Sequence, residues 1–135
     1  MTAVDLAFHH LGVACRDLDR EARSYAALGY APDGSHFDDP AQGVHGVFLT
    51  GPGPRLELLV ELAGSTVLTP WLDKGIAVYH IAFVTPDMER SIVAAARLGA
   101  KLVSSPRAAV AFDGRHVAFV MLPNRMLIEL IAAER

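Results

Sequence analysis

Two histidines and two glutamates occupy matching places in two similar stretches of the chain. His10 and His80 lie seventy positions apart, and each opens an apolar run that leads into a helix start. Glu57 and Glu129 lie seventy-two positions apart, each embedded between apolar residues. Imidazole and carboxylate groups together are ligands for a divalent ion such as Zn²⁺, Co²⁺, Ni²⁺, Mn²⁺ or Fe²⁺, and do not select among these metals. The repeat therefore predicts one metal site built from the four side chains.

Each of these residues alone also has an ordinary structural interpretation. A single histidine on a strand is usually a hydrogen-bonded core or surface residue, and a glutamate that alternates with leucines usually faces solvent. An ionised carboxylate that is buried instead is costly unless it is paired or bound to a metal. The joint occurrence of two histidines and two glutamates favours the metal site, which would leave one or two coordination positions for substrate oxygens.

The elements that must position these side chains form one pattern written twice. An apolar strand over residues 8–15 is followed by Asp17, a good helix N-cap, and the helix is expected to stop at Gly29. In the second copy Asp87 and Gly99 take the same roles. The predicted buried stripes of the two helices are Leu18, Ala22, Tyr25 and Leu28, and then Met88, Ile92, Ala95 and Leu98.

Strand-like runs bounded by glycine and proline follow each helix. The expected strands cover residues 31–37, 44–49 and 56–62, and then 80–84, 101–104, 116–122 and 127–132. We therefore expect an α+β fold in a single domain over residues 1–135. Two tandem βαβββ modules, about residues 6–64 and 76–135, would form one composite, cupped mixed sheet around the metal site. The link between the modules, residues 63–75, includes a short helix predicted near Thr69.

Composition excludes several classes of partner. The net charge is −3 and no run of Lys or Arg suggests a basic patch, so nucleic acid is not an expected partner. No apolar stretch approaches the roughly 18 residues of a membrane span, and the first residues lack the pattern of a signal peptide. The single cysteine, Cys15, is predicted to be a buried structural thiol. We expect a cytoplasmic protein.

Several sequence motifs resemble those of the vicinal oxygen chelate superfamily, which includes glyoxalase I, methylmalonyl-CoA epimerases, extradiol dioxygenases and bleomycin-binding proteins. The resemblance covers about residues 8–131, and within the superfamily the methylmalonyl-CoA epimerases are the most similar. It is carried by His10-Leu11-Gly12-Val13-Ala14, Gln42-Gly43-Val44, Leu56-Glu57-Leu58-Leu59, Tyr79-His80-Ile81-Ala82-Phe83, Ser105-Pro106-Arg107, Gly114-Arg115-His116-Val117-Ala118-Phe119 and Leu127-Ile128-Glu129-Leu130.

The resemblance implies that the four matched residues are metal ligands and that Glu129 is also the catalytic base. It further implies a small-molecule substrate of the acyl-CoA type and a homodimer. One position departs from the epimerase pattern, in which a glutamate directly before Gln-Gly-Val acts as the second acid or base. Ala41 stands there in this chain. Four residues of the same polar segment remain open as substitutes: His36, Asp38, Asp39 and His45.

Two arginines and two further histidines complete the set of polar candidates. Arg107 and Arg115 are candidates for binding a substrate carboxylate or phosphate, with plain surface charge as the alternative. His9 and His116 receive no predicted role.

The leading functional hypothesis is a metal-dependent enzyme that stabilises an enolate or enediolate, most like a methylmalonyl-CoA epimerase. A glyoxalase-I-like isomerase or lyase is the first alternative. The second is a non-catalytic protein that binds an antibiotic-type small molecule, which the retention of all four ligands disfavours. An extradiol dioxygenase is disfavoured because Glu57 would fill a position that such an iron site keeps open.

Overall fold

The computed structural model describes residues 4–133, so both ends of the predicted single domain, residues 1–3 and 134–135, lie outside the described residues. Within that range the chain has eight strands of a mixed sheet and three α-helices, which confirms the α+β class. The described residues divide into two compact units, one of residues 10–79 and one that joins the N-terminal residues up to His9 to residues 80 onward. The boundaries fall inside the first and fifth strands.

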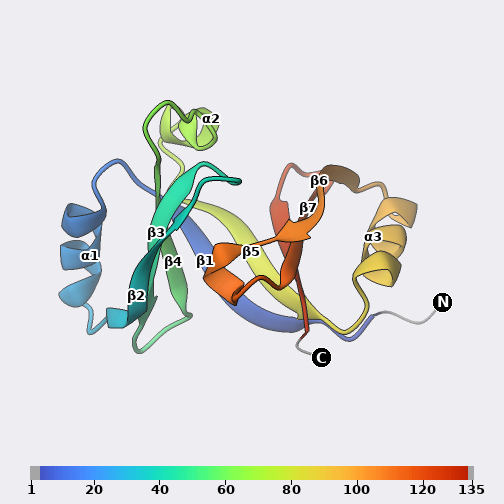
Figure 1. Cartoon of the computed structure of the whole chain (residues 1–135), viewed down its shortest axis with the longest axis horizontal. Coiled ribbons are helices and arrows are strands. Elements are labelled where there is room, and N and C mark those ends of the chain that lie inside the picture. Colours follow the sequence, from blue (N-terminus) through green and yellow to red (C-terminus); the bar gives the residue numbers. More distant parts are fainter. Residues whose placement is uncertain (1–3, 134–135) are drawn as a thin grey trace. The chain divides into compact units, whose positions relative to one another are not determined.

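The 10–79 unit contains the first βαβββ pattern. Its elements in chain order are β1 (Ala7–Ala14), α1 (Leu18–Ala26), β2 (Ala31–Asp39), β3 (Val44–Thr50), β4 (Leu56–Glu61) and α2 (Thr69–Leu72). The strands follow the order β2-β3-β4-β1, in which β1 and β4 are parallel and the other neighbours are antiparallel. Figure 1 shows α1 alongside these strands.

The second unit repeats the pattern. Its elements are β5 (Val78–Thr85), α3 (Met88–Arg97), β6 (Lys101–Ala108), a short 3₁₀ helix η1 (Val110–Phe112), β7 (His116–Met121) and β8 (Leu127–Ala132). The strand order is β5-β8-β7-β6, with β5 and β8 parallel. The equivalent strands of the two units therefore have the same order and the same directions, as a duplicated sequence predicts.

Both helices start at the aspartates that the sequence predicts. The Asp17 and Asp87 carboxylates accept hydrogen bonds from the backbone N–H groups of Arg20 and Arg90, at 3.1 and 3.0 Å. Each cap satisfies a first-turn donor that has no partner inside the helix. Gly29, at φ +100°, follows the C-terminal turn of α1, as expected from its freedom to adopt a left-handed conformation.

The apolar stripes are shorter than the sequence predicts, because the last predicted residue of each is wrong. Leu28 is 65% exposed and Leu98 is 74% exposed. Each lies beyond the last residue of its helix, Ala26 or Arg97, where helical periodicity no longer sets the direction of the side chain.

Each unit has its own apolar core between helix and sheet. The core of the 10–79 unit consists of Val13, Cys15, Leu18, Val47, Leu49, Leu56 and Leu58, with Ala22 and Tyr25 of α1 packed against it. In the second unit Met88, Ile92 and Ala95 of α3 pack against Ala100, Val120, Ile128 and Leu130. Burial of these stripes against one face of the strands leaves the opposite face of each unit to carry other chemistry.

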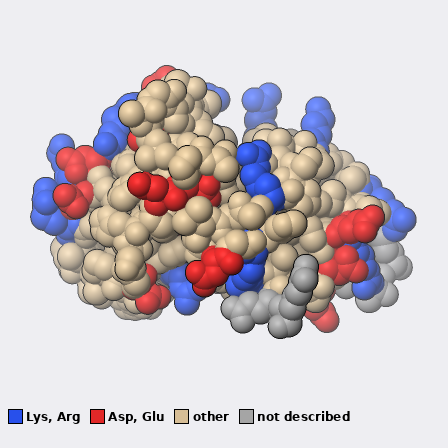
Figure 2. All heavy atoms as spheres, in the orientation of Figure 1, with Lys and Arg blue, Asp and Glu red and all other residues tan. Residues whose placement is uncertain are grey.

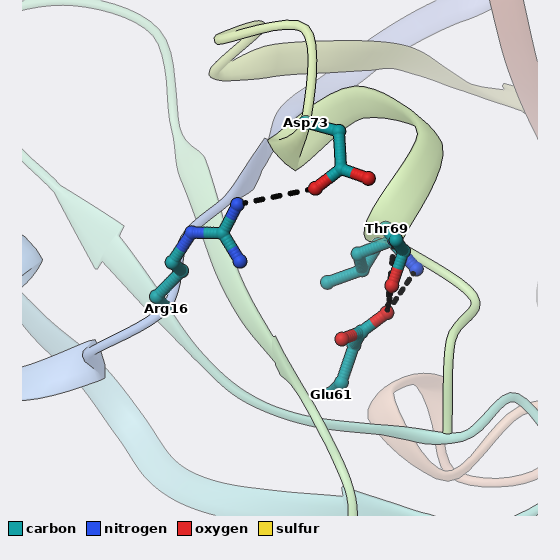
Figure 3. A network of polar contacts seen from close by, with 5 residues as sticks. Arg16, Glu61, Thr69 and Asp73 are labelled. Carbon is teal, nitrogen blue, oxygen red and sulfur yellow. Dashed lines mark hydrogen bonds and ion pairs between the residues drawn. The ribbon is translucent and has the colours of Figure 1, made fainter. Parts of the chain in front are cut away.

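A polar network fixes the short helix α2 within the 10–79 unit (Figure 3). One carboxylate oxygen of Glu61, at the end of β4, accepts hydrogen bonds from the N–H groups of Leu68 and Thr69 and from the Thr69 hydroxyl, at 2.8–2.9 Å. Arg16 contacts Asp73 at 3.5 Å, at the other end of the helix. Glu61 therefore caps the helix, whose own N-cap, Leu68, provides no side-chain hydrogen bond.

The surface carries charges of both signs. On the face drawn in Figure 2, acidic and basic side chains are interspersed among uncharged ones. Among residues 4–133, no helix is long and apolar enough to cross a membrane.

Candidate metal centre

The first histidine–glutamate pair lies inside the 10–79 unit. His10 Nε2 is 3.1 Å from Glu57 Oε1, and the two side chains are 0% and 6% exposed. The Phe48 ring stands edge-on to the His10 ring, with centroids 5.3 Å apart. The strand register explains the cluster, because Glu57 is the cross-strand partner of both Phe48 on β3 and Gly12 on β1, two residues from His10.

The second pair lies inside the other unit and has the same construction. His80 Nε2 is 3.2 Å from Glu129 Oε1, and the side chains are 1% and 3% exposed. Phe119 stands edge-on to His80, with ring centroids 5.6 Å apart. Glu129 is the cross-strand partner of Phe119 on β7 and of Ala82 on β5, two residues from His80.

Phe48 and Phe119 are functional candidates that the sequence analysis missed. They lie seventy-one positions apart, each between apolar residues on the strand before the glutamate, and this spacing could have identified them. Their rings add apolar surface beside each histidine, which strengthens electrostatic interactions by lowering the local dielectric.

Burial decides between the interpretations left open for the glutamates. Glu57 and Glu129 are 4% and 3% exposed, so neither is the solvent-facing residue of a half-buried strand. Each pair presents one imidazole nitrogen and one carboxylate oxygen, a donor set that fits a divalent ion of the borderline-to-hard kind. Each unit therefore contains a buried His–Glu pair that could bind a metal.

One of the four open substitutes for the missing glutamate, Asp39, shares a sheet face with Glu57. Asp39 is the partner of Val44, which is the partner of Glu61, and Glu61 lies on the Glu57 face of β4. Asp39 is 3% exposed and accepts a hydrogen bond from the Gln42 N–H at 3.2 Å. This carboxylate thus closes the turn that carries Ala41.

The other three substitutes gather on the opposite face of β2 and β3. Asp38 is the cross-strand partner of His45, and His45 is the partner of Val60, whose side chain points away from the Glu57 face. His45 contacts both Asp38 and His36. This placement separates His36, Asp38 and His45 from Glu57 by the thickness of the sheet.

The structure gives the two arginines different surroundings. Arg107 is exposed on β6, donates a hydrogen bond to the Ser104 hydroxyl at 2.9 Å, and shares the sheet face of Glu129 through the register Arg107–Val117–Ile131. Arg115 donates from Nε to the Ala132 carbonyl at 2.7 Å. Arg115 thus ties the chain before β7 to the end of β8.

The remaining polar candidates have structural surroundings. Cys15 is 5% exposed, its thiol donates to the Leu59 carbonyl at 3.5 Å, and burial raises its pKa to about 12, with the nearby Glu21 and Asp17 carboxylates contributing. The predicted burial of this thiol is confirmed. His9 packs edge-on against Phe112 with ring centroids 5.4 Å apart, and His116 is exposed at the start of β7.

Known proteins resemble this chain in fold and, at a lower level, in sequence. Residues 9–119 match the Glyoxalase/Bleomycin resistance protein/Dioxygenase superfamily. An ethylmalonyl-CoA/methylmalonyl-CoA epimerase of Cereibacter sphaeroides is 28% identical over 126 residues, which cover 90% of this chain and 94% of that protein. The crystal structure of methylmalonyl-CoA epimerase from Mycobacterium tuberculosis is 26% identical, with a TM-score of 0.79 and coverage of 100% of this chain and 94% of that chain.

A third similar protein was solved with a ligand. The structure of a Streptomyces coelicolor methylmalonyl-CoA epimerase variant in complex with 2-nitronate-propionyl-CoA is 25% identical, with a TM-score of 0.72 and coverage of 97% of this chain and 96% of that chain. These similarities confirm the resemblance that the sequence motifs indicate. The chain belongs to the Glyoxalase/Bleomycin resistance protein/Dioxygenase superfamily.

Proposed function

We propose that the two His–Glu pairs supply the four ligands of one divalent ion and that the chain is a metal-dependent enzyme. The observation that carries the proposal is the repetition of one buried arrangement, with His–Glu contacts of 3.1 and 3.2 Å in the two units. Two buried carboxylates would be costly to keep for structure alone, since an apolar pair of similar size often serves as well. A bound divalent ion would explain why both carboxylates are buried.

The residues of the chain would divide the chemistry between them. When bound, a divalent ion polarises a substrate carbonyl and stabilises the charge that develops on its oxygen. Glu129 would accept the proton from the neighbouring carbon, and His80 would hold that carboxylate in place. The apolar side chains around Glu129, which include the half-buried Phe119 and the buried Ile131, would keep bulk water from the developing enolate.

The activity best supported is epimerisation of an acyl-CoA at the carbon next to its thioester carbonyl. The curated relative is an ethylmalonyl-CoA/methylmalonyl-CoA epimerase, and the Streptomyces coelicolor relative binds an acyl-CoA analogue. Arg107 is our candidate for binding a substrate carboxylate or phosphate, because it is exposed and shares the face of Glu129. Arg115 is a weaker candidate because its Nε already donates to Ala132.

Ala41 favours a second candidate, a glyoxalase-I-like isomerase or lyase. Epimerisation needs a proton removed from one face of the enolate and a proton delivered to the other face. Transfer of a proton between adjacent carbons can use one carboxylate on one face. Of the four substitutes considered for the missing glutamate, Asp39 is the one that shares the Glu57 face, and its carboxylate already accepts a hydrogen bond from the Gln42 N–H.

The decisive experiment measures metal content of the purified protein and then solvent-deuterium uptake at the α-carbon of methylmalonyl-CoA. We expect bound metal, and exchange that is lost on Glu129→Gln. A metal-free protein whose behaviour is unchanged by Glu129→Gln would overturn the enzyme proposal and favour a binding protein. Metal without exchange would remove the epimerase and retain the metal site.

A further inference from the structure

A second group of potential metal ligands lies on β2 and β3, apart from the His–Glu pairs. The Nδ1 atom of His36 is 3.2 Å from the Nε2 atom of His45, and the two rings are tilted by 48° with centroids 5.3 Å apart. The other nitrogen of His45, Nδ1, lies 2.5 Å from Asp38 Oδ1. The His45 side chain is 31% exposed and that of Asp38 is 65% exposed, so solvent reaches the cluster.

The fold brings the three residues together in a specific way. Asp38 and His45 are directly opposed across the β2–β3 ladder. His36 and Asp38 are two residues apart on β2 and therefore point to the same side. The register shifts between Asp33 and Phe37, and Gly34 adopts φ +85° within this irregular stretch. The bulge sets the position from which His36 meets His45.

We propose that His36 and His45 bind a divalent transition-metal ion, with Asp38 as the residue that positions His45. Nitrogens that each lie about 2.0–2.1 Å from a common ion, at tetrahedral or right angles, are separated by about 2.9–3.4 Å. The observed 3.2 Å between His36 Nδ1 and His45 Nε2 lies within this range. The two rings are therefore already spaced as a pair of ligands.

The contact with Asp38 prepares His45 for this role. A carboxylate beside Nδ1 holds the proton on that nitrogen, which leaves the lone pair of Nε2 directed away from Asp38 and toward His36. Carboxylate–histidine–metal arrangements of this kind fix the tautomer and raise the basicity of the ligand. With the His45 proton on Nδ1, His36 Nδ1 would donate a hydrogen bond to His45 Nε2 when no ion is bound. When His36 carries its proton on Nε2 instead, the ion would take the place of that hydrogen.

The chemistry of the ligands selects the class of ion. Two neutral imidazoles, with water in the remaining positions, suit Cu²⁺, Ni²⁺ or Zn²⁺, and the usual affinity order places Cu²⁺ first. The site would be distinct from the His10–Glu57 pair because its side chains lie on the opposite face of the strands. An ion here would join the bulge of β2 to β3 and stabilise the ribbon that leads to the Ala41 turn.

The duplication supplies a matched control within the same chain. His116 occupies on β7 the place that His45 occupies on β3, seventy-one positions earlier. Its cross-strand partner is Ala108 where His45 has Asp38, and Pro106 stands two residues before Ala108 where His36 stands before Asp38. His116 therefore reports how an exposed strand histidine behaves without the other two members.

The test is a titration of the full chain with Cu²⁺. NMR measures the paramagnetic broadening of the ring signals of each histidine as Cu²⁺ is added. We expect His36 and His45 to broaden together at Cu²⁺ concentrations about tenfold or more below those that broaden His116. His36→Gln and His45→Gln should each abolish this early broadening, and His116→Gln should leave it unchanged. Thermal unfolding of each variant without metal checks that the fold is intact.

The role of Asp38 has its own readout. Asp38→Ala should weaken Cu²⁺ binding by about tenfold and shift the nitrogen chemical shifts of His45 toward the other tautomer, while both rings still broaden. If Asp38 only stabilised the fold, Asp38→Ala would leave the tautomer of His45 unchanged. Broadening of His116 at the same Cu²⁺ concentration as His45, or early broadening that survives both His36→Gln and His45→Gln, would overturn the proposed site.

Discussion

Ala41 is the residue that most restricts the chemistry we propose. It stands where the epimerase pattern has a glutamate, and it lines an open pocket of about 530 Å³ whose walls are mostly small residues. A longer side chain therefore has room at this position. With one acid–base carboxylate, a proton can be exchanged with solvent from one face without inversion of the carbon.

We predict that methylmalonyl-CoA in deuterated solvent gains deuterium faster than it inverts. Ala41→Glu should raise the ratio of inversion to exchange, because the new carboxylate can serve the opposite face of the enolate. The measurement is parallel NMR and circular dichroism on one reaction mixture. Ala41→Gln is the matched control, since it has the size of glutamate without its charge. Equal rates of inversion and exchange in the unsubstituted protein would show that a second acid–base group already acts.

Cys15 should give the folded state a specific dependence on alkaline pH. Burial raises its pKa from an ordinary value of 9.0 to about 12 in the folded state. Below pH 9 the thiol is protonated in both states and contributes no slope. Between pH 9 and about 12 only the unfolded chain loses the proton, so the free energy of unfolding should fall by about 1.4 kcal/mol per pH unit from this group.

Denaturant unfolding from pH 8 to 11 measures this slope. Tyr25 also has a pKa raised by burial and adds its own loss at high pH, so the thiol is isolated by the difference between the protein and Cys15→Ala. The variant should be less stable at pH 8 because of the small cavity, yet should lose less stability per pH unit above pH 9. Identical slopes would mean that the thiol titrates normally in the fold.

At the scale of elements, α2 depends on a side chain outside the helix. Glu61 accepts three hydrogen bonds at the start of a four-residue helix that has no side-chain cap of its own. Glu61→Ala should lower the free energy of unfolding by about 1–3 kcal/mol and speed hydrogen exchange of the Leu68 and Thr69 amides. Thr69→Val removes only one of the three bonds and should have a smaller effect. Equal effects would assign the stability to the hydroxyl contact instead.

Elements whose limits are set by local chemistry could be predicted from the sequence. The caps at Asp17 and Asp87 depend on neighbouring backbone groups, and both lie where expected. The end of α1 was predicted less well, because the helix ends at Ala26 and Gly29 follows it with a positive φ. The predicted burial of Leu28 and Leu98 was wrong, because the helical periodicity of apolar residues does not show where a helix ends. Similarly, β6 extends to Ala108 and η1 follows it, neither of which turn residues alone indicate.

Sheet faces were the harder part of the candidate site. From the sequence alone, four residues around Ala41 were equally good candidates to replace the missing glutamate. The alternation of side chains along a strand does not predict their faces here, because a bulge interrupts the strand and pairing with another strand sets its register. The ladder from β2 to β4 separates Asp39 from Asp38 and places them on opposite faces. By contrast, the His–Glu pairs could be predicted, because the duplication preserves the strand pairing of these residues as well as their sequence.

At the scale of the whole molecule, the two His–Glu pairs can bind one ion together or one ion each. Each unit has a complete His–Glu pair of its own, so two independent sites of two ligands are a real alternative to one site of four. A site of four ligands binds an ion more tightly than a site of two. Because the ion binds only the native state, its binding raises the free energy of unfolding of the protein. The two alternatives differ in stoichiometry.

We predict that the two His–Glu pairs together bind one divalent ion tightly, and that either Glu57→Gln or Glu129→Gln loses nearly all of it, measured in a His36→Gln background that removes the proposed site on β2 and β3. Loss from both variants follows because each substitution removes one ligand from the same ion, although the residues belong to different units. Elemental analysis after dialysis measures the metal content. In thermal unfolding, a chelator should lower the midpoint of the protein that keeps both glutamates and should not change the midpoint of either glutamate variant. His116→Gln, a substitution of an exposed residue at the start of β7, serves as the control and should retain the ion. In the His36→Gln background, two ions per chain that fall to one in each glutamate variant would show that each unit binds its own metal, and the proposed joint site would then be wrong.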